Sequence, residues 1–279
     1  MNDKYFYADL HGHLGMWKYK GSFDKVIDIA LKRLGTGGAL GVDSDPVCND
    51  FRYEDFISKS SEKYIKEDID GRATRVIDRG DSSNLIYIIN GHEVETRIGH
   101  FLVSASESYT SFHKGKEADW EKMIEIANKQ NSPVFIVHSF SLWGAGKFFE
   151  EKEHHLNLFQ GIEAANANCY FPLPGYPRPN NRSAEFFKRV YPFHSNLGGV
   201  VFQDNHKLYE IGRNATRMLG SLDPNNFIQS LSAGIRSCTP DRLEEHKYSP
   251  FWGFIGGTHH LFDNIVYEGI SLFKKIKGN

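Results

Sequence analysis

Histidines and carboxylates recur along this chain at the ends of apolar segments. Each can donate a nitrogen or oxygen atom to a metal ion, and their order is His11, His13, Glu93, His100, His138, Asp204, His206. The apolar segments beside them have the length and composition of β-strands. Imidazoles combined with carboxylates suit Zn²⁺, Mn²⁺ or iron better than Mg²⁺ or Ca²⁺, which favour oxygen ligands. The pattern therefore predicts a transition-metal site.

No single motif carries this prediction. The H-x-H pair at 11–13 is weak evidence by itself, because a histidine beside an apolar segment is more often a core or surface residue than a ligand. Two further groups of metal-binding residue types follow, at 91–100 and at 204–206. The three groups together indicate one site assembled from distant parts of the chain.

The elements that must position these residues alternate between strand and helix. A helix is expected from Phe23 to Leu34, with Ser22 as N-cap and Gly35 as its end. The mixed-charge stretch 51–82 is expected to be a solvated helix and loop. Such alternation predicts a parallel sheet with helical crossovers, in which reactive groups gather at the carboxyl ends of the strands. The expected strands are 5–9, 39–43, 85–89, 100–104, 134–138, 161–165 and 199–204.

Length and composition fit one catalytic domain of 279 residues. Barrels built from strands and helices commonly reach about 250 residues as a single domain. Hydrophobic residues make up 40% of the chain, which is enough for a sizeable core. A formal net charge of -2 gives no global basic field, so nucleic-acid binding is not indicated, although a local basic groove stays compatible with it.

Cysteine usage and the apolar segments bear on the cellular compartment. The three cysteines, Cys48, Cys169 and Cys238, show no CxxC spacing and read as buried small residues in a reducing environment. No basic and apolar signal segment precedes the first strand, and no apolar run approaches the roughly 20 residues needed to cross a bilayer. We expect a cytoplasmic protein without a membrane segment.

The metal-binding motifs resemble those of the PHP family, the polymerase and histidinol phosphatase domain of metal-dependent phosphoesterases. That family shows D-x-H-x-H, then G-x-E with a following histidine, an isolated histidine, and a closing S-D-A-H. This chain is similar at 9–13, 91–100, 138 and 203–206, and again at 210–212 and 231–236. The resemblance covers about residues 5 to 240. It implies a distorted (β/α)7 TIM-like barrel and a single hydrolase domain over 1–279.

The resemblance also implies roles for the ligands. His11, His13, Glu93 and Asp204 would hold one divalent ion (Zn, Mn or Fe), and Glu93, His100 and His138 a second, with Glu93 bridging the two ions. The implied reaction is hydrolysis of a phosphate mono- or diester through a metal-activated hydroxide. Glu93, Asp204 and His206 would be the catalytic residues, and His206 would act as a ligand or as a proton donor to the leaving oxygen.

A third ion is in doubt. The family's T-D-H element reads Val42-Asp43-Ser44 here, and the stretch 14–21 contains no carboxylate or imidazole. Asp43 or Asp45 could partly replace the missing ligand. An Asp at such a position is more often a cap or turn residue.

Candidates outside the ligand set have two readings each. Arg97 and Arg213 could bind a phosphate bidentately, or could form surface ion pairs. Arg178 is a further candidate for substrate binding, because it supplies positive charge in the proline-rich stretch 166–182. The proline-rich stretch 166–182 could line the substrate site or could be a packed surface loop. Glu163 is expected to support the ligands without binding metal, and His92 is expected to face away from Glu93.

Two other functions remain open at this stage. An amidohydrolase or TatD-like nuclease also begins with H-x-H, but this chain shows no strand-end lysine in the bridging position, and its closing D-x-H differs from their lone aspartate. A noncatalytic, metal-stabilised binding module is the second alternative, and retention of all seven ligands speaks against it. The expected partner is a small phosphorylated substrate. The sequence leaves the substrate's identity and the oligomeric state open.

Overall fold

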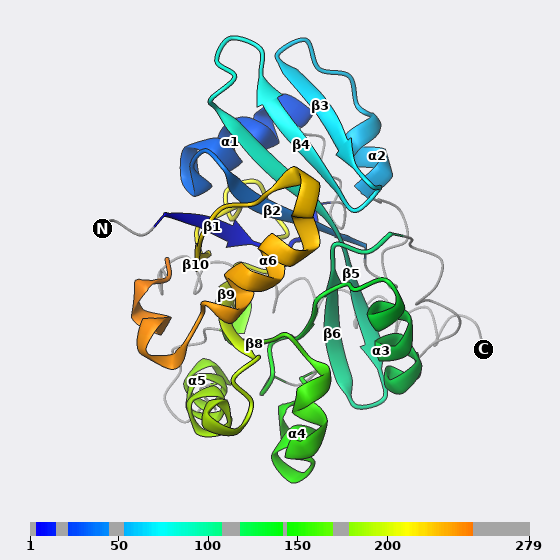
Figure 1. Ribbon diagram of the computed structural model, residues 1–279, viewed down its shortest axis with the longest axis vertical. Coiled ribbons are helices and arrows are strands. Elements are labelled where there is room, and N and C mark those ends of the chain that lie inside the picture. The colour runs from blue at the N-terminus through cyan, green and yellow to red at the C-terminus, as the bar shows by residue number, and fades with distance from the viewer. Residues whose placement is uncertain are drawn as a thin grey trace, which may run out of the picture.

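The computed structural model describes residues 4–14, 22–44, 53–107, 118–141, 144–169 and 179–247 (Figure 1). Its strands are β1 Tyr5–Asp9, β2 Gly38–Ser44, β3 Tyr64–Ile69, β4 Ala73–Asp78, β5 Leu85–Thr96, β6 Gly99–Ser104, β7 Val134–Ile136, β8 Gly161–Asn166, β9 Gly198–Phe202 and β10 Thr216–Leu219. Its α-helices are α1 Phe23–Leu34, α2 Tyr53–Ser58, α3 Trp120–Lys129, α4 Gly146–Glu151, α5 Pro179–Val190 and α6 Phe227–Arg236.

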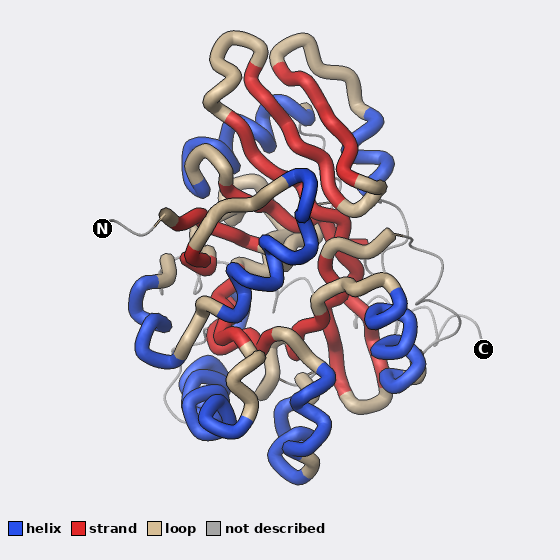
Figure 2. Tube along the Cα trace, viewed as in Figure 1, coloured by secondary structure: helices blue, strands red, loops and turns tan. Residues whose placement is uncertain are grey.

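Within the described residues, ten strands form one sheet that curls into a nearly closed barrel. The strand order is β10-β1-β2-β5-β6-β7-β8-β9, and the β3–β4 ribbon is joined to β5. The two ends of this order meet where the Thr216 hydroxyl of β10 donates to Val201 O of β9 (2.9 Å) and accepts from Val201 N (2.8 Å). The predicted fold class, a distorted α/β barrel, and its seven predicted strands are confirmed. Figure 2 shows the strands in the middle of the molecule and most helices outside them.

The prediction of a purely parallel sheet was wrong. Strands β1, β2 and β5 are parallel to one another, as are β7, β8 and β9, but β6 runs antiparallel to both β5 and β7. A short turn joins β5 to β6, and such a turn can connect only antiparallel neighbours. As a result, β6 begins at the barrel end where the parallel strands finish. His100, near the start of β6, therefore lies at the same end as residues that follow the other strands.

Alternation along the strands fills the barrel with apolar side chains. Phe6 and Ala8 of β1, Ile89 of β5 and Phe202 of β9 belong to one buried cluster, together with Leu231 of α6. Helix α6 covers the amino-terminal end of the barrel, since a Cβ on Gly198, the first residue of β9, would contact Ile235 O at 2.1 Å. In Figure 1 this helix crosses in front of the strands. The opposite, carboxyl end is left for polar residues.

Helices and one ribbon surround the barrel. Helix α1 packs on β2, and its ends match the prediction: the Ser22 hydroxyl accepts from Lys25 N at 3.2 Å, and Gly35 ends the helix with φ 82°. Helices α3, α4 and α5 contribute to a second buried cluster with β6 and β7. The expectation of a solvated helix and loop over 51–82 was wrong in part, because β3 and β4 form an antiparallel ribbon that extends the sheet from β5. Among the described residues, no helix is both long and apolar enough to cross a membrane.

A buried carboxylate joins β1 to the chain after β9. Asp9 accepts hydrogen bonds from Gln203 N (3.0 Å), Gly212 N (3.0 Å) and Asn205 Nδ2 (3.2 Å). Three residues after Asp9, Gly12 pairs with Asn205 in an isolated parallel β-bridge. A Cβ at position 12 would lie 2.5 Å from Asn205 Nδ2, so any other residue there would displace the Asn205 side chain. This closure brings the chain after β1 against the chain after β9.

Candidate metal centre

The structure brings the seven predicted ligands together at the carboxyl end of the barrel. His11 and His13 follow β1, Asp204 and His206 follow β9, and His138 follows β7. Glu93 comes from the second half of β5, opposite Leu102 of β6. Four groups of three ligand atoms lie within 4.8 Å of one another, namely His11/His13/Glu93, His11/His138/Asp204, His13/Asp204/His206 and Glu93/His100/His138.

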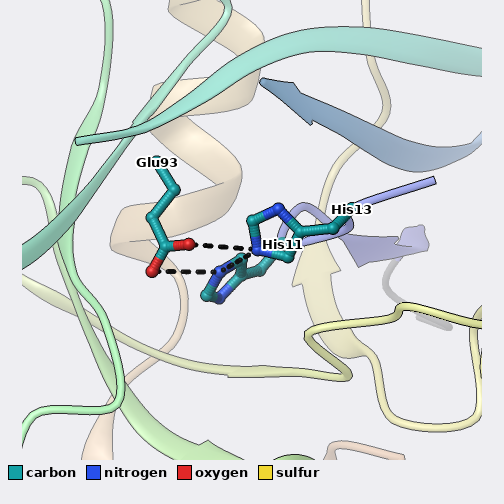
Figure 3. Close-up of side chains that lie close together, drawn as sticks. All are labelled: His11, His13 and Glu93. Atoms are coloured by element: carbon teal, nitrogen blue, oxygen red, sulfur yellow. Dashed lines mark hydrogen bonds and ion pairs between the residues drawn. The ribbon is translucent and has the colours of Figure 1, made fainter. Parts of the chain in front are cut away.

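Strand periodicity explains why Glu93 reaches this cluster. Tyr87 and Ile89 of β5 face the barrel interior, so Glu93, which continues the same alternation, faces inward as well. Its neighbour His92 points to the other face, as expected, and its Nδ1 contacts the Ser44 hydroxyl of β2. Figure 3 shows the Glu93 carboxylate directed at the His11 and His13 rings.

The first set of ligand atoms has the spacing of a tetrahedral metal site. His13 Nε2 lies 3.3 Å from His11 Nε2, 3.1 Å from Glu93 Oε2 and 3.4 Å from Asp204 Oδ1. His11 Nε2 lies 3.7 Å from Asp204 Oδ1 and 3.8 Å from Glu93 Oε1. Ligands about 2.0–2.1 Å from a tetrahedral zinc ion stand roughly 3.3 Å apart. The residues present therefore fit a divalent metal ion beside His11 and His13, with carboxylate oxygens of Glu93 and Asp204 nearby.

A second set of contacts uses the other face of the same carboxylate. Glu93 Oε1 lies 2.9 Å from His100 Nδ1 and 2.9 Å from His138 Nε2. Oε1 also lies 3.8 Å from His11 Nε2, so Glu93 belongs to two of the groups of candidate ligands, one with His11 and His13 and one with His100 and His138.

His206 lies at the margin of the cluster, with His13 and Asp204. Its Nδ1 is 2.9 Å from Asp204 O and 3.6 Å from Asp204 Oδ1. The Glu210 carboxylate accepts from His206 N at 2.7 Å and from Lys207 N at 2.8 Å, which fixes the turn that carries the imidazole. Burial raises the pKa of the Glu210 carboxyl to about 7, although these two hydrogen bonds oppose the rise.

Asp43 occupies a supporting position beside this centre. Its Oδ2 accepts from Gly12 N at 2.6 Å, which ties the H-x-H segment to β2. Its buried Oδ1 makes no hydrogen bond among the described residues, and Gly91 permits its approach, since a Cβ at 91 would lie 1.8 Å from that oxygen. Asp43 belongs to none of the described ligand groups. Asp45, the other suggested replacement, lies outside the described residues.

The backbone is strained at two of the candidate ligands. His138 has φ 31° and Asp204 has φ 56°, both in the left-handed region that non-glycine residues rarely adopt. Such conformations cost about 1–3 kcal/mol each and persist where surrounding structure imposes them, often at functional sites. His138 lies two residues after β7 and Asp204 two residues after β9, so both strained residues stand where the chain leaves a strand beside the cluster.

Opposite charges balance inside the centre. Burial would raise the pKa of the Glu93 carboxyl, but the surrounding imidazoles, with His100 the strongest, hold that pKa well below its usual range. Burial would likewise raise the pKa of Asp204, and His11, His206 and His13 lower it. For His13, burial lowers the pKa, yet the Glu93 and Asp204 carboxylates outweigh it and raise the pKa to about 9. At neutral pH the metal-free cluster therefore holds the anionic Glu93 and Asp204 carboxylates against a protonated His13 imidazole.

Metal binding at this cluster is expected to become tighter with rising pH up to about 9. At pH 7 the metal-free His13 imidazole carries a proton, and an ion must displace it because only the neutral ring is a ligand. Each proton displaced makes apparent affinity about tenfold stronger per pH unit below the pKa. Because the pKa of His11 is raised as well, titration with Mn²⁺ should show at least about tenfold tighter binding at pH 8 than at pH 7. An ordinary histidine would give almost no change above pH 7, so equal affinities at the two pH values would contradict the protonated cluster.

The expected phosphate-binding arginines are placed as follows. Arg97 is exposed in the turn between β5 and β6, at the barrel end that carries the cluster. Arg213 is half-buried, and its Nε donates to Tyr209 O at 3.3 Å in the chain that follows His206. Arg178 lies outside the described residues, as do Cys48 and the middle of the 166–182 stretch. The substrate-binding roles of the three arginines stay predictions.

Several supporting residues were missed or only partly foreseen from the sequence. Glu163 was expected to support the ligands, and its Oε1 lies 3.4 Å from His11 Nδ1. Asn166 and Asp9 were not singled out, although Asn166 Nδ2 donates to Asp204 Oδ2 at 3.2 Å. The available signals were the Asp that opens D-x-H-x-H and the Asn three residues after Glu163.

Comparisons with known proteins found similarity only among solved structures. No protein-family model and no curated protein matches this chain. One similar structure is a two-domain protein from Bacteroides vulgatus that contains a predicted PHP-like metal-dependent phosphoesterase, with 13% identity and a TM-score of 0.48 over 84% of this chain and 64% of that one. Another is endonuclease Q in complex with a 27-mer duplex that has an abasic lesion at the active site, with 13% identity and a TM-score of 0.49 over 83% of this chain and 56% of that one.

This chain spans less than two thirds of either protein, and similarity at this level assigns no activity to it. The support for a hydrolase comes from the cluster of candidate ligands itself. A buried set of imidazoles and carboxylates with metal-ligand spacing suits a metal-dependent hydrolase that uses divalent ions.

Proposed function

We propose that this protein is a metal-dependent phosphoesterase with a centre for two divalent transition-metal ions. The observation that carries the proposal is the position of Glu93, whose Oε2 faces His13 and whose Oε1 faces His100 and His138. One ion would be held by His11, His13, Glu93 and Asp204, and the other by Glu93, His100 and His138. The nitrogen-rich ligand set favours Zn²⁺, Mn²⁺ or iron.

The chemistry of such a centre suits phosphate esters. Two bound cations lower the pKa of a water and neutralise the charge that develops on a phosphoryl group during in-line displacement. In our proposal Asp204 holds His206 in place through its backbone carbonyl, and the His206 imidazole protonates the leaving oxygen. Arg97, exposed at the same barrel end, binds the phosphate. Arg213 and Arg178 are the other two residues that we assign to substrate binding.

The proposal extends to the whole chain as one domain, 1–279, acting on a small phosphorylated substrate. Free thiols at Cys169 and Cys238 agree with the reducing cytoplasm that the sequence predicts. Two alternatives differ from this proposal. An amidohydrolase-like enzyme would break an amide or lactone bond, and a noncatalytic binding module would hold metal without turnover.

The test is a substrate panel on protein of defined metal content. Chelation should abolish hydrolysis of generic phosphate mono- and diesters, and reloading with Mn²⁺ or Zn²⁺ should restore it. Matched amide and lactone substrates should be cleaved far more slowly. Metal uptake without any turnover would favour a binding module, and preferential cleavage of amides or lactones would favour an amidohydrolase. Either result would refute the phosphoesterase proposal.

A further inference from the structure

Glu163 and Asn166 share one side of β8 because the strand is irregular. In a regular strand, residues three apart point to opposite faces. Here the register against β9 shifts between Glu163 and Ala165, so that Glu163 pairs with Val200 and Ala165 pairs with Val201. The extra residue turns the following part of the strand over, as bulges do beside many active sites. Both side chains therefore reach the base of the ligand cluster, and both residues are fully buried.

The Glu163 carboxylate contacts three hydrogen-bond donor groups, from His11, His138 and Asn166. Oε1 accepts from His11 Nδ1 (3.4 Å) and from Asn166 Nδ2 (3.0 Å). Oε2 accepts from His138 N (2.5 Å) and from Asn166 Nδ2 (3.0 Å). An ionised carboxylate only accepts hydrogen bonds, so it can satisfy all three donor groups at once. A glutamine of the same shape would direct its own N–H groups at one of these donors.

Each of these contacts acts on a different ligand. The bond to His11 Nδ1 fixes the tautomer in which Nε2 is the ligand atom, and that Nε2 faces the cluster 3.3 Å from His13 Nε2. The bond from His138 N holds the backbone at its left-handed φ of 31°. Asn166 Nδ2 also donates to Asp204 Oδ2, which leaves Asp204 Oδ1 directed at His11 and His13.

The pair is itself anchored to helix α5. Asn180, near the start of α5, accepts from Asn166 N through Oδ1 (2.9 Å) and donates to Asn166 O through Nδ2 (2.8 Å). These two bonds fix the backbone from which the Asn166 amide extends. The position of the amide therefore depends on the packing of a whole helix against β8.

We propose that Glu163 and Asn166 form a positioning bracket that sets the geometry of both ion subsites, acting through His11, His138 and Asp204 without contact to substrate. The proposal rests on the two-ion centre proposed above. It goes beyond the expectation that Glu163 supports the ligands, because one buried pair links ligands of the first ion, His11 and Asp204, to His138 of the second.

The isosteric variant Glu163→Gln tests the bracket. Loss of such supporting contacts typically weakens metal binding about 10- to 100-fold, and we expect a loss in this range for Mn²⁺, together with a changed visible absorption spectrum of the Co²⁺-loaded protein. Glu163→Asp, which keeps an acceptor-only group, should recover part of the affinity. Glu125→Gln makes the same chemical change at an exposed position of α3 and should bind Mn²⁺ as the wild type does.

A second variant keeps the proposal falsifiable if Glu163→Gln does not fold. Asn166→Ala removes the donor to Asp204 without adding charge and should also weaken Mn²⁺ binding at least several-fold. Wild-type affinity and an unchanged Co²⁺ spectrum in a folded Glu163→Gln or Asn166→Ala protein would overturn the bracket.

The result is separable from the proposed function. Weakened metal binding in the variants of a protein that never hydrolyses phosphoesters would support the bracket while refuting the phosphoesterase. Unchanged metal binding in the variants of an active enzyme would do the reverse. A wild type that binds no metal would overturn both.

Discussion

Replacing Glu93 by Gln is expected to remove both metal ions and to lower phosphoester turnover about a thousandfold. The amide cannot supply two anionic oxygens, so neither the His13 side nor the His100 and His138 side keeps its shared carboxylate. Bound cations contribute several kcal/mol to phosphoryl transfer, and about 4 kcal/mol corresponds to a thousandfold in rate. Metal content per chain, measured after dialysis, and turnover under saturating substrate check the two parts.

The control for this variant is Glu125→Gln, the same chemical change at an exposed position of α3. Glu125 belongs to none of the described metal-ligand groups, so this protein should retain both ions. If Glu93→Gln retained full metal content, or lost the ion of one subsite only, the assignment of Glu93 as the bridge would be wrong.

His138→Ala is expected to lose one ion of the two and nearly all turnover. His138 Nε2 approaches Glu93 Oε1 in the second subsite, and without it only Glu93 and His100 remain there. The first subsite keeps His11, His13, Glu93 and Asp204, so about half of the bound metal should survive. A single ion cannot clamp both the attacking and the leaving oxygen. We therefore expect at least a hundredfold loss of turnover, measured on metal-loaded protein.

His138→Ala changes both a candidate ligand and a strained backbone position, and a glycine variant separates these two effects. Glycine accepts the φ of 31° without cost, whereas alanine does not. His138→Gly should lose the same ion as His138→Ala and be more resistant to thermal unfolding. An exposed imidazole, His154, gives the matched control, and His154→Ala should keep full metal content and activity. Unchanged turnover in both position-138 variants would exclude the second subsite from catalysis.

The sequence predicts seven of the barrel strands because they contain apolar runs, and β2 and β9 are buried at every position. It missed β10, Thr216–Leu219, whose four residues alternate between buried and half-buried. It could not give the direction of β6, since periodicity carries no information about strand direction. The β3–β4 ribbon was missed because β3 is charged and mostly exposed, with only its end residues Tyr64 and Ile69 buried, so it shows no apolar alternation. A local signal was present in Asp70-Gly71, where both residues have positive φ at the turn between the two strands.

The candidate site also contains residues that the sequence predicts and residues that it does not. The seven ligands could be singled out because imidazoles and carboxylates beside apolar strands are chemically distinctive. Asp9, Asn166 and Asn205 could not, because each acts only once the barrel closes and places distant segments in contact. The bulge in β8 is equally invisible in the sequence, since alternation alone would place Asn166 on the face opposite Glu163.

Anomalous X-ray scattering from crystals loaded with Mn²⁺ tests the proposed two-ion centre most directly. We expect two anomalous peaks about 3.5–4 Å apart, with the Glu93 carboxylate between them. One peak should lie beside His11, His13 and Asp204, and the other beside His100 and His138. A single peak, or no peak within this cluster, would contradict a two-ion centre bridged by Glu93.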